Sequence, residues 1–261
     1  MFISAATEPG SPETPNEDWL GLSPTAAVVL DGVTVFPGAT TGCRHGTPWY
    51  VNELGTRLVA DASNCDKPLT EVLASVIKDV ASLHQDVCDL EEVGAPSAAV
   101  AMVRAGKQTL DYLVLSDVTI LLDSISDLRV ITDDRVADTV RDLTETANTG
   151  DEVMRRRAHY RNKNGGYWVA AADPSVAHHA ITGSIPIAGL RHAILMTDGV
   201  TRLVDPFQEL DWYGLLTAAV KFGSASVIER VRRTEAGDPL RHHWPRFKVS
   251  DDATIAIVAG V

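Results

Sequence analysis

Residues 26–32 read Ala-Ala-Val-Val-Leu-Asp-Gly, a short apolar run that stops at an Asp-Gly pair. The arrangement recurs at residues 193–199, Ala-Ile-Leu-Met-Thr-Asp-Gly, and in reverse at residues 250–256, Ser-Asp-Asp-Ala-Thr-Ile-Ala. Short apolar runs bounded by turn residues are typical of buried strands. A carboxylate at a strand end is held rigidly, and a following glycine lets the backbone bend close to a ligand. The pattern therefore predicts acids converging on hard cations, which prefer oxygen ligands.

Helical patterns separate these strands. Pro48, which is tolerated in a first helical turn, opens a helix expected to reach about Leu58. Apolar residues at three- and four-residue spacing from Leu69 to Val87 predict an amphipathic helix with one buried face. Further helices are predicted within residues 133–161, 212–222 and 225–233.

Three apolar runs in the middle of the chain, at residues 98–103, 110–115 and 118–122, predict an antiparallel meander, whereas residues 7–16 predict an irregular lead-in. Helices between early strands, and again before the last strand, favour sheets packed between helical layers. Strands from both ends of the chain are expected to share these sheets. We therefore expect one domain over residues 1–261.

Composition narrows the class of protein. The 261 residues are 45% hydrophobic and carry a net charge of −12, which disfavours nucleic acid and anionic membranes as partners. The opening segment lacks a basic stretch and a long apolar core, so we expect no signal peptide and a cytoplasmic protein. Cys43, Cys65 and Cys88 show no CxxC spacing and cannot all pair, which favours reduced thiols.

Six short motifs occur in an order that resembles the metal-dependent Ser/Thr phosphatases of type 2C, the PPM family. They cover the chain from about residue 16 to its end: Asn16-Glu17-Asp18, Val29-Leu30-Asp31-Gly32, Pro96-Ser97-Ala98, Leu115-Ser116-Asp117, Met196-Thr197-Asp198-Gly199 and Ser250-Asp251-Asp252-Ala253-Thr254. The resemblance implies an α+β fold, a four-layer α-β-β-α sandwich with two central antiparallel sheets.

The resemblance also implies a metal site for two Mn²⁺ or Mg²⁺ ions. Asp31 is similar to the acid that bridges both metals, with the Gly32 carbonyl as a further ligand. Asp198 and Asp251 are similar to the remaining carboxylate ligands, and Glu17 to the acid that orients a water on the metal. Asp117 falls where many bacterial members bind a third, weaker metal. We expect oxygen ligands alone on these metals.

The activity that the resemblance implies is hydrolysis of a phosphomonoester by a water activated between two cations. The expected substrate is a phosphoserine or phosphothreonine protein, or a small phosphorylated compound. A pseudo-phosphatase that serves as a regulatory binding module is the alternative. A different two-metal hydrolase, such as a nuclease, is disfavoured by the acidic charge and the lack of a basic stripe.

The sequence departs from the family at the residues that hold the phosphate. Relatives carry an Arg before the first motif, but residues 1–43 contain no Lys or Arg. Arg44, Arg161 and Arg202 are candidates for this task, and we favour Arg44. His45 is a candidate general acid because its ordinary pKa suits proton transfer near neutral pH, and a structural hydrogen bond is its other reading.

A variable flap is expected around residues 133–170. Within it, residues 161–168 combine Asn and Gly with Tyr167 and Trp168. This segment could recognise the substrate, because exposed loops commonly carry binding residues. Equally, the two aromatic side chains could anchor the flap on the core.

Overall fold

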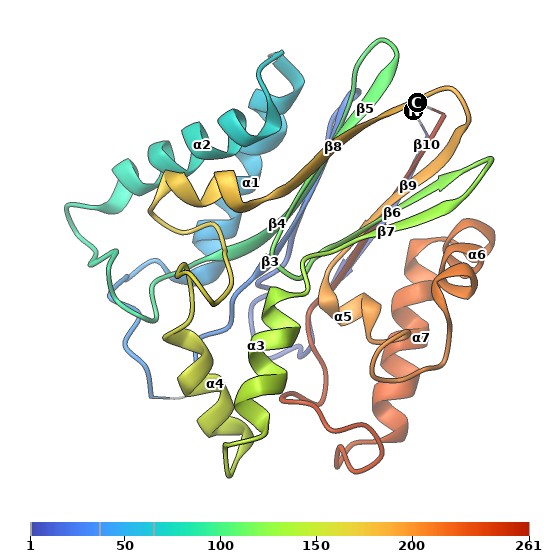
Figure 1. Ribbon diagram of the computed structural model, residues 1–261. Helices are drawn as coiled ribbons and strands as arrows, with labels where there is room; N and C mark the ends of the chain where they lie inside the picture. The colour runs from blue at the N-terminus through green and yellow to red at the C-terminus, as the bar shows by residue number, and fades with distance from the viewer. Residues whose placement is uncertain (1, 37, 65, 261) are drawn as a thin grey trace.

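Two five-stranded antiparallel sheets lie face to face at the centre of the molecule (Figure 1). The computed structural model describes residues 2–36, 38–64 and 66–260, so Cys65 lies outside the described residues. The first sheet has the order β1 (Phe2–Glu8), β10 (Ala253–Ala259), β9 (Leu190–Met196), β6 (Thr119–Ser124) and β7 (Leu128–Ile131). The second has the order β2 (Trp19–Leu22), β3 (Ala26–Gly32), β4 (Ala98–Ala105), β5 (Thr109–Leu115) and β8 (Ile181–Pro186).

Helices cover the outer face of each sheet (Figure 1). Helices α1 (Gly46–Asn64) and α2 (Leu69–His84) pack on the second sheet, and α6 (Trp212–Phe222) and α7 (Ser224–Gly237) pack on the first. Shorter elements are α3 (Arg135–Thr144), α4 (Gly150–Ala158), the 3-10 helix η1 (Pro174–His179) and α5 (Asp198–Thr201). The α+β fold and the α-β-β-α layering are thus confirmed.

Strand β3 shows why its sequence is continuously apolar. Successive side chains of a strand point to opposite faces of the sheet. Val28 and Leu30 pack with α1 and α2, whereas Ala27 and Val29 pack between the two sheets. Both faces are therefore buried from Ala26 to Leu30, and the apolar run ends at Asp31.

The predicted meander is wrong in its third strand. Strands β4 and β5 are paired, but β6 pairs with β7 and β9 in the other sheet. Ser116, at the point where the chain leaves β5, has a positive φ of 72°. The apolar pattern could not reveal this change of sheet, because the inner faces of both sheets bury the same kinds of side chain.

Other boundaries also differ from expectation. The lead-in is partly a strand, since Thr7 and Glu8 belong to β1, which pairs with β10 along its length. Helix α1 extends well past Leu58 to Asn64. Helix α2 ends at His84, and Leu83 and Val87, which we placed on the buried face, are 50% and 51% exposed.

The predicted flap region contains α3 and α4, which lie side by side beyond one end of the sheets (Figure 1). Val136, Tyr167 and Val169 form a small buried cluster there, and Val33 packs against it. Tyr167 thus anchors this segment on the chain that directly follows Asp31-Gly32. None of the helices in the described ranges has the length and apolar character required to cross a membrane.

Candidate active site

A pocket of about 90 Å³ lies beside the flap segment and gathers most of the predicted metal ligands. Asp31, Gly32, Asp117, Asp198 and Asp251 all line it. The other lining residues are Val33, Thr34, Ala99, Met154, Arg157, Arg202, Phe247 and Lys248. Positions separated by as many as 220 residues in the sequence, Asp31 and Asp251, therefore share one small cavity.

Pairing of β9 with β10 brings Asp198 and Asp251 together. Asp198 begins α5 just beyond the end of β9, and Asp251 lies two residues before β10. The backbone N–H of Thr197 donates to the carbonyl of Thr254 at 3.0 Å, and the N–H of Thr254 donates to Oγ1 of Thr197 at 3.0 Å. The two acids are thus fixed on adjacent strands at the same edge.

The glycines of the two Asp-Gly pairs allow close packing of the chain against itself. A Cβ atom on Gly32 would lie 2.4 Å from the carbonyl oxygen of Glu17, and one on Gly199 would lie 2.0 Å from that of Asp252. We expected these glycines to let the backbone approach a ligand. In the structure, the nearest atoms belong to other segments of the protein.

Glu17 and Asp18 support the pocket from behind. Oε2 of Glu17 accepts a hydrogen bond from Oγ1 of Thr34 at 2.7 Å, and its backbone N–H donates to Asp252 at 2.6 Å. Asp18 is buried and accepts a hydrogen bond from Thr197 at 2.9 Å. Glu17 is not among the residues that line the cavity, so it reaches the pocket through Thr34.

Two cations hold Asp251 from opposite sides. Nζ of Lys248 lies 2.6 Å from Oδ1 of Asp251 and 2.7 Å from Oγ1 of Thr34. The Arg202 guanidinium donates to Oδ2 of Asp251 at 2.7 Å and to Glu235 at 3.1 Å. Arg202 was one of the three arginines expected as candidates to bind the substrate phosphate. In the structure, the Arg202 guanidinium binds the carboxylates of Asp251 and Glu235 instead.

Charge repulsion is concentrated at Asp31 and Asp198. Burial, followed by the nearby charges of Asp198, Asp18, Asp117 and Asp251, raises the pKa of Asp31 well above its ordinary value. Burial and the charge of Asp251 raise the pKa of Asp198 to about 6. Divalent cations would offset this repulsion, and an all-carboxylate set suits Mn²⁺ or Mg²⁺. The residues present therefore fit the expected metals.

The structure does not bring Arg44 or His45 into this pocket, where we expected both. Arg44 is exposed and does not line the cavity. The His45 ring stacks on Trp49, and its Nδ1 lies 3.4 Å from Sγ of Cys88. Both residues precede α1, and the loop after Asp31-Gly32 carries them away from the carboxylates.

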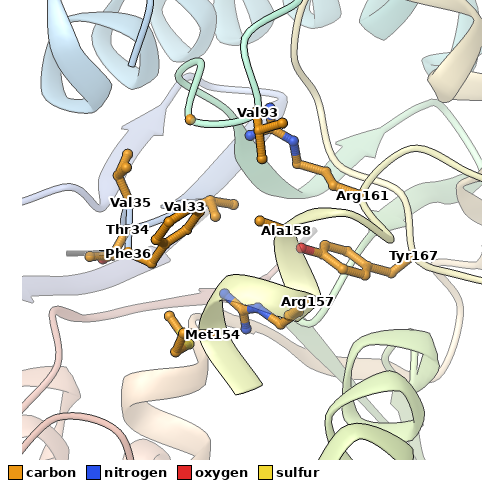
Figure 2. A pocket seen from close by; sticks show the side chains of 11 residues that line it. Val33, Thr34, Val35, Phe36, Val93, Met154, Arg157, Ala158, Arg161 and Tyr167 are labelled. Carbon is orange, nitrogen blue, oxygen red and sulfur yellow. The ribbon is translucent and has the colours of Figure 1, made fainter. Parts of the chain in front are cut away.

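A smaller cavity of about 20 Å³ shares Val33, Thr34, Met154 and Arg157 with the first one. Residues 33–36 line one side, and Arg157, Arg161 and Tyr167 line the other (Figure 2). Arg161 donates to the carbonyls of Ala95 at 2.8 Å and Glu92 at 3.3 Å, so it fastens a loop. Its guanidinium also donates to Oγ of Ser97 at 3.0 Å, so these three groups occupy it.

Arg157 lines both cavities, and sequence reasoning missed it. Its guanidinium carbon lies 5.9 Å from the centre of the Tyr167 ring. Among the described residues, no carboxylate forms an ion pair with it. Its only signal in the sequence was the run Arg155-Arg156-Arg157, which does not distinguish the one arginine that faces the pocket.

A scan of protein-family models and a search of curated proteins gave no match to this sequence. Solved structures did match over nearly the whole chain. The serine/threonine phosphatase Stp1 from Staphylococcus aureus is 17% identical, with 99% of this chain and 94% of that chain covered and a TM-score of 0.58. The Mycobacterium tuberculosis phosphatase PstP/Ppp is 17% identical, with 98% and 97% covered and a TM-score of 0.59.

The catalytic domain of PstP in complex with two manganese ions is a further match, at 15% identity and a TM-score of 0.58, with 98% of this chain and 96% of that chain covered. A PPM Ser-Thr phosphatase, MsPP from Mycobacterium smegmatis, also matches at 16% identity, with 99% and 98% covered and a TM-score of 0.56. At these identities the similarity establishes the fold. This chain has the fold of the PPM Ser/Thr phosphatases.

Proposed function

We propose that the protein is a metal-dependent phosphomonoester hydrolase that acts on phosphoserine or phosphothreonine in proteins. The observation that carries this proposal is the convergence of Asp31, Asp117, Asp198 and Asp251 in one pocket. Asp31, Asp198, Asp251 and the Gly32 carbonyl would hold two Mn²⁺ or Mg²⁺ ions, and Asp117 would contribute to a third. The similarity to structures named Ser/Thr phosphatases supports the substrate class.

Bound metals would supply an activated water and would neutralise charge on the phosphoryl group. The chain itself supplies the positions of the groups around them. Arg202 fixes Asp251 from one side, and Thr34 links Glu17 to Lys248. Arg157 is the arginine best placed to hold a phosphate, because its planar fork can bind two oxygens and none of the described acids occupies it.

The test is release of phosphate from p-nitrophenyl phosphate and from a phosphothreonine peptide, measured with Mn²⁺ and with a chelator. Asp31→Asn and Asp198→Asn should abolish release in Mn²⁺ while the circular-dichroism spectrum stays unchanged. Asp79→Asn, an exposed acid on α2, is the matched control and should keep full activity. Equal rates with and without chelator would contradict the metal-dependent reaction.

A regulatory pseudo-phosphatase is the second candidate, and the position of Lys248 favours it. Its ammonium group binds Asp251, a predicted metal ligand, so it competes with a divalent cation for the same carboxylate. Such a protein would bind the phosphothreonine peptide without hydrolysing it in saturating Mn²⁺. Titration calorimetry together with the phosphate-release assay separates the two functions.

A further inference from the structure

Four side chains with nitrogen and sulfur donors meet at a place outside the carboxylate pocket. They are Cys43 and His45, from the loop before α1, and His84 and Cys88, from the end of α2 and the turn that follows it. One donor atom from each lies within 4.8 Å of the other three. None of the four residues lines the carboxylate pocket.

Three sulfur–nitrogen distances among the donors match those around a single metal ion, and the sulfur–sulfur distance is slightly shorter. Sγ of Cys43 lies 3.2 Å from Sγ of Cys88, 3.5 Å from Nδ1 of His84 and 3.6 Å from Nδ1 of His45. Sγ of Cys88 lies 3.4 Å from Nδ1 of His45. Tetrahedral zinc, with bonds of roughly 2.3 Å to sulfur and 2.0–2.1 Å to nitrogen, separates its ligands by roughly 3.4–3.8 Å.

We propose that Cys43, His45, His84 and Cys88 form a structural Zn²⁺ site. Two thiolates and two neutral imidazoles are a common closed zinc set, in which all four positions belong to the protein. Such ligands select zinc over Mn²⁺ or Mg²⁺, which prefer oxygen. Binding releases the two thiol protons, so the site is neutral overall.

Backbone hydrogen bonds join the two segments that carry the four ligands. Cys88 follows His84 by four residues, and its N–H donates to the His84 carbonyl at 2.9 Å. The N–H of Asp89 donates to the carbonyl of Gly42 at 2.8 Å, which joins the two segments. Gly42 has a φ of +60°, and a Cβ there would lie 2.5 Å from the Asp89 carbonyl oxygen. Glycine at this position therefore permits the close approach.

Packing of aromatic rings orients both histidines. The Trp49 ring stacks on His45 with centroids 4.3 Å apart and meets His84 edge-on at 4.9 Å. Cys43 and His84 are 7% and 3% exposed, so half of the donor set is shielded from water. Rigid, partly shielded ligands lose little conformational freedom when they bind a metal.

The site would stabilise the segment that runs from the carboxylate pocket to α1. This segment starts at Gly32, contributes Val33 and Thr34 to the pocket, and reaches the cluster at Cys43. A zinc ion would join the end of this segment, at Cys43, to α2, which packs on the sheet that contains β3. The ion would thus hold the loop next to the active site without taking part in the reaction.

The experiment measures zinc in the full-length protein, purified with a reductant and dialysed in excess Mg²⁺ so that the carboxylate pocket is occupied by a competing ion. We expect about one zinc per chain by elemental analysis. Replacing zinc with Co²⁺ should give the thiolate-to-cobalt absorption and the strong ligand-field bands typical of a tetrahedral site. Cys43→Ser and Cys88→Ser should each lose these signals.

Asp31→Asn is the matched control, because it alters the carboxylate pocket and should keep the zinc and the cobalt spectrum. The wild-type spectrum decides the question even if a cysteine variant fails to fold. Reduced wild-type protein that binds no zinc and gives no thiolate-to-cobalt absorption would overturn the proposal. A Cys43–Cys88 disulfide in the purified protein, with no zinc uptake after reduction, would overturn it as well.

Discussion

The ammonium group of Lys248 lies 2.6 Å from Oδ1 of Asp251, in the same pocket as three other carboxylates. Lys248 comes from the loop between α7 and β10, three residues before the acid that it contacts. The pocket therefore contains a fixed positive charge at a position where a metal ligand is predicted. This charge weakens the attraction of the acids for divalent cations.

Lys248→Met should tighten Mn²⁺ binding, because it removes a competing charge while keeping a side chain of similar length. We expect the Kd to fall about tenfold, which corresponds to roughly 1.4 kcal/mol. Titration calorimetry with Mn²⁺ measures it. Lys78→Met, on the exposed face of α2, should leave the Kd unchanged. Weaker Mn²⁺ binding in Lys248→Met would mean that the lysine organises the ligands rather than competing with the metal.

The protein without active-site metal should become more stable as the pH falls from 7.5 to 5. Burial and the charge of Asp251 raise the pKa of Asp198 to about 6, above its value of about 3.9 in an unfolded chain. The folded state therefore binds this proton more readily, and the free energy of unfolding increases as the pH falls through 6 toward 4. Urea unfolding in chelator measures the change.

Asp198→Asn is the control for this pH dependence. The variant cannot lose the charge, so the difference in its urea midpoint between pH 7.5 and pH 5 should be smaller than in the wild type. Saturating Mn²⁺ should raise the midpoint more at pH 7.5 than at pH 5, since protons and metal compete for the same carboxylates. The prediction would be contradicted if the urea midpoint of the wild type increased between pH 7.5 and pH 5 by no more than that of Asp198→Asn.

The acids could be predicted from the sequence because each follows or precedes a locally visible strand. Val28 and Leu30 face one layer and Val29 the other, so β3 reads as an unbroken apolar run that ends at Asp31. Strand β1 gave no such signal. It lies at the edge of its sheet and is defined by pairing with β10, at the opposite end of the chain. Local patterns do not report pairing over such separations.

The cations of the site depend on tertiary contacts that the sequence does not display. Lys248 lies in a loop whose shape is set by Asp238, which accepts hydrogen bonds from the backbone N–H groups of His242, His243 and Trp244. Arg157 reaches the pocket because α4 packs beside residues 33–36. Neither arrangement follows from spacing, which is why the sequence alone favours Arg44, the first cation in the chain.

The sequence displays each half of the cluster of cysteines and histidines but not the approach of one half to the other. Cys43 and His45 are two residues apart, and His84 and Cys88 are four apart, a spacing that places both on one side of a helix turn. The absence of CxxC pairs led to the reading of unpaired thiols. Only the packing of the loop before α1 against the end of α2 joins the two halves.

Arg157→Ala should raise KM for a phosphomonoester, because its guanidinium lines the pocket and forms no ion pair with an acid in the described parts of the chain. We expect a loss in kcat/KM that corresponds to roughly 2 kcal/mol, typical of a charge-assisted hydrogen bond. Steady-state kinetics at saturating Mn²⁺ measures it. Arg44→Ala is the comparison, since Arg44 is exposed outside the pocket and should have unchanged kinetics. A loss in Arg44→Ala alone would restore our first expectation.

Arg202→Met should destabilise the fold by about 3 kcal/mol, because it leaves a buried acid short of a partner. Glu235 is 1% exposed and accepts from Arg202 at 3.1 Å, with only Arg232 remaining at 2.7 Å in the variant. Chemical denaturation measures the loss.

Arg233→Met is the control, because Arg233 lies on the exposed face of α7, the helix that carries Glu235, and it should change stability by less than about 0.5 kcal/mol. Adding Glu235→Met to Arg202→Met should recover part of the stability, because it removes the buried carboxylate, while Arg232 loses the partner it had at 2.7 Å. A double variant that is no more stable than Arg202→Met alone would contradict the prediction, because the lost stability would then not come from the Glu235 carboxylate.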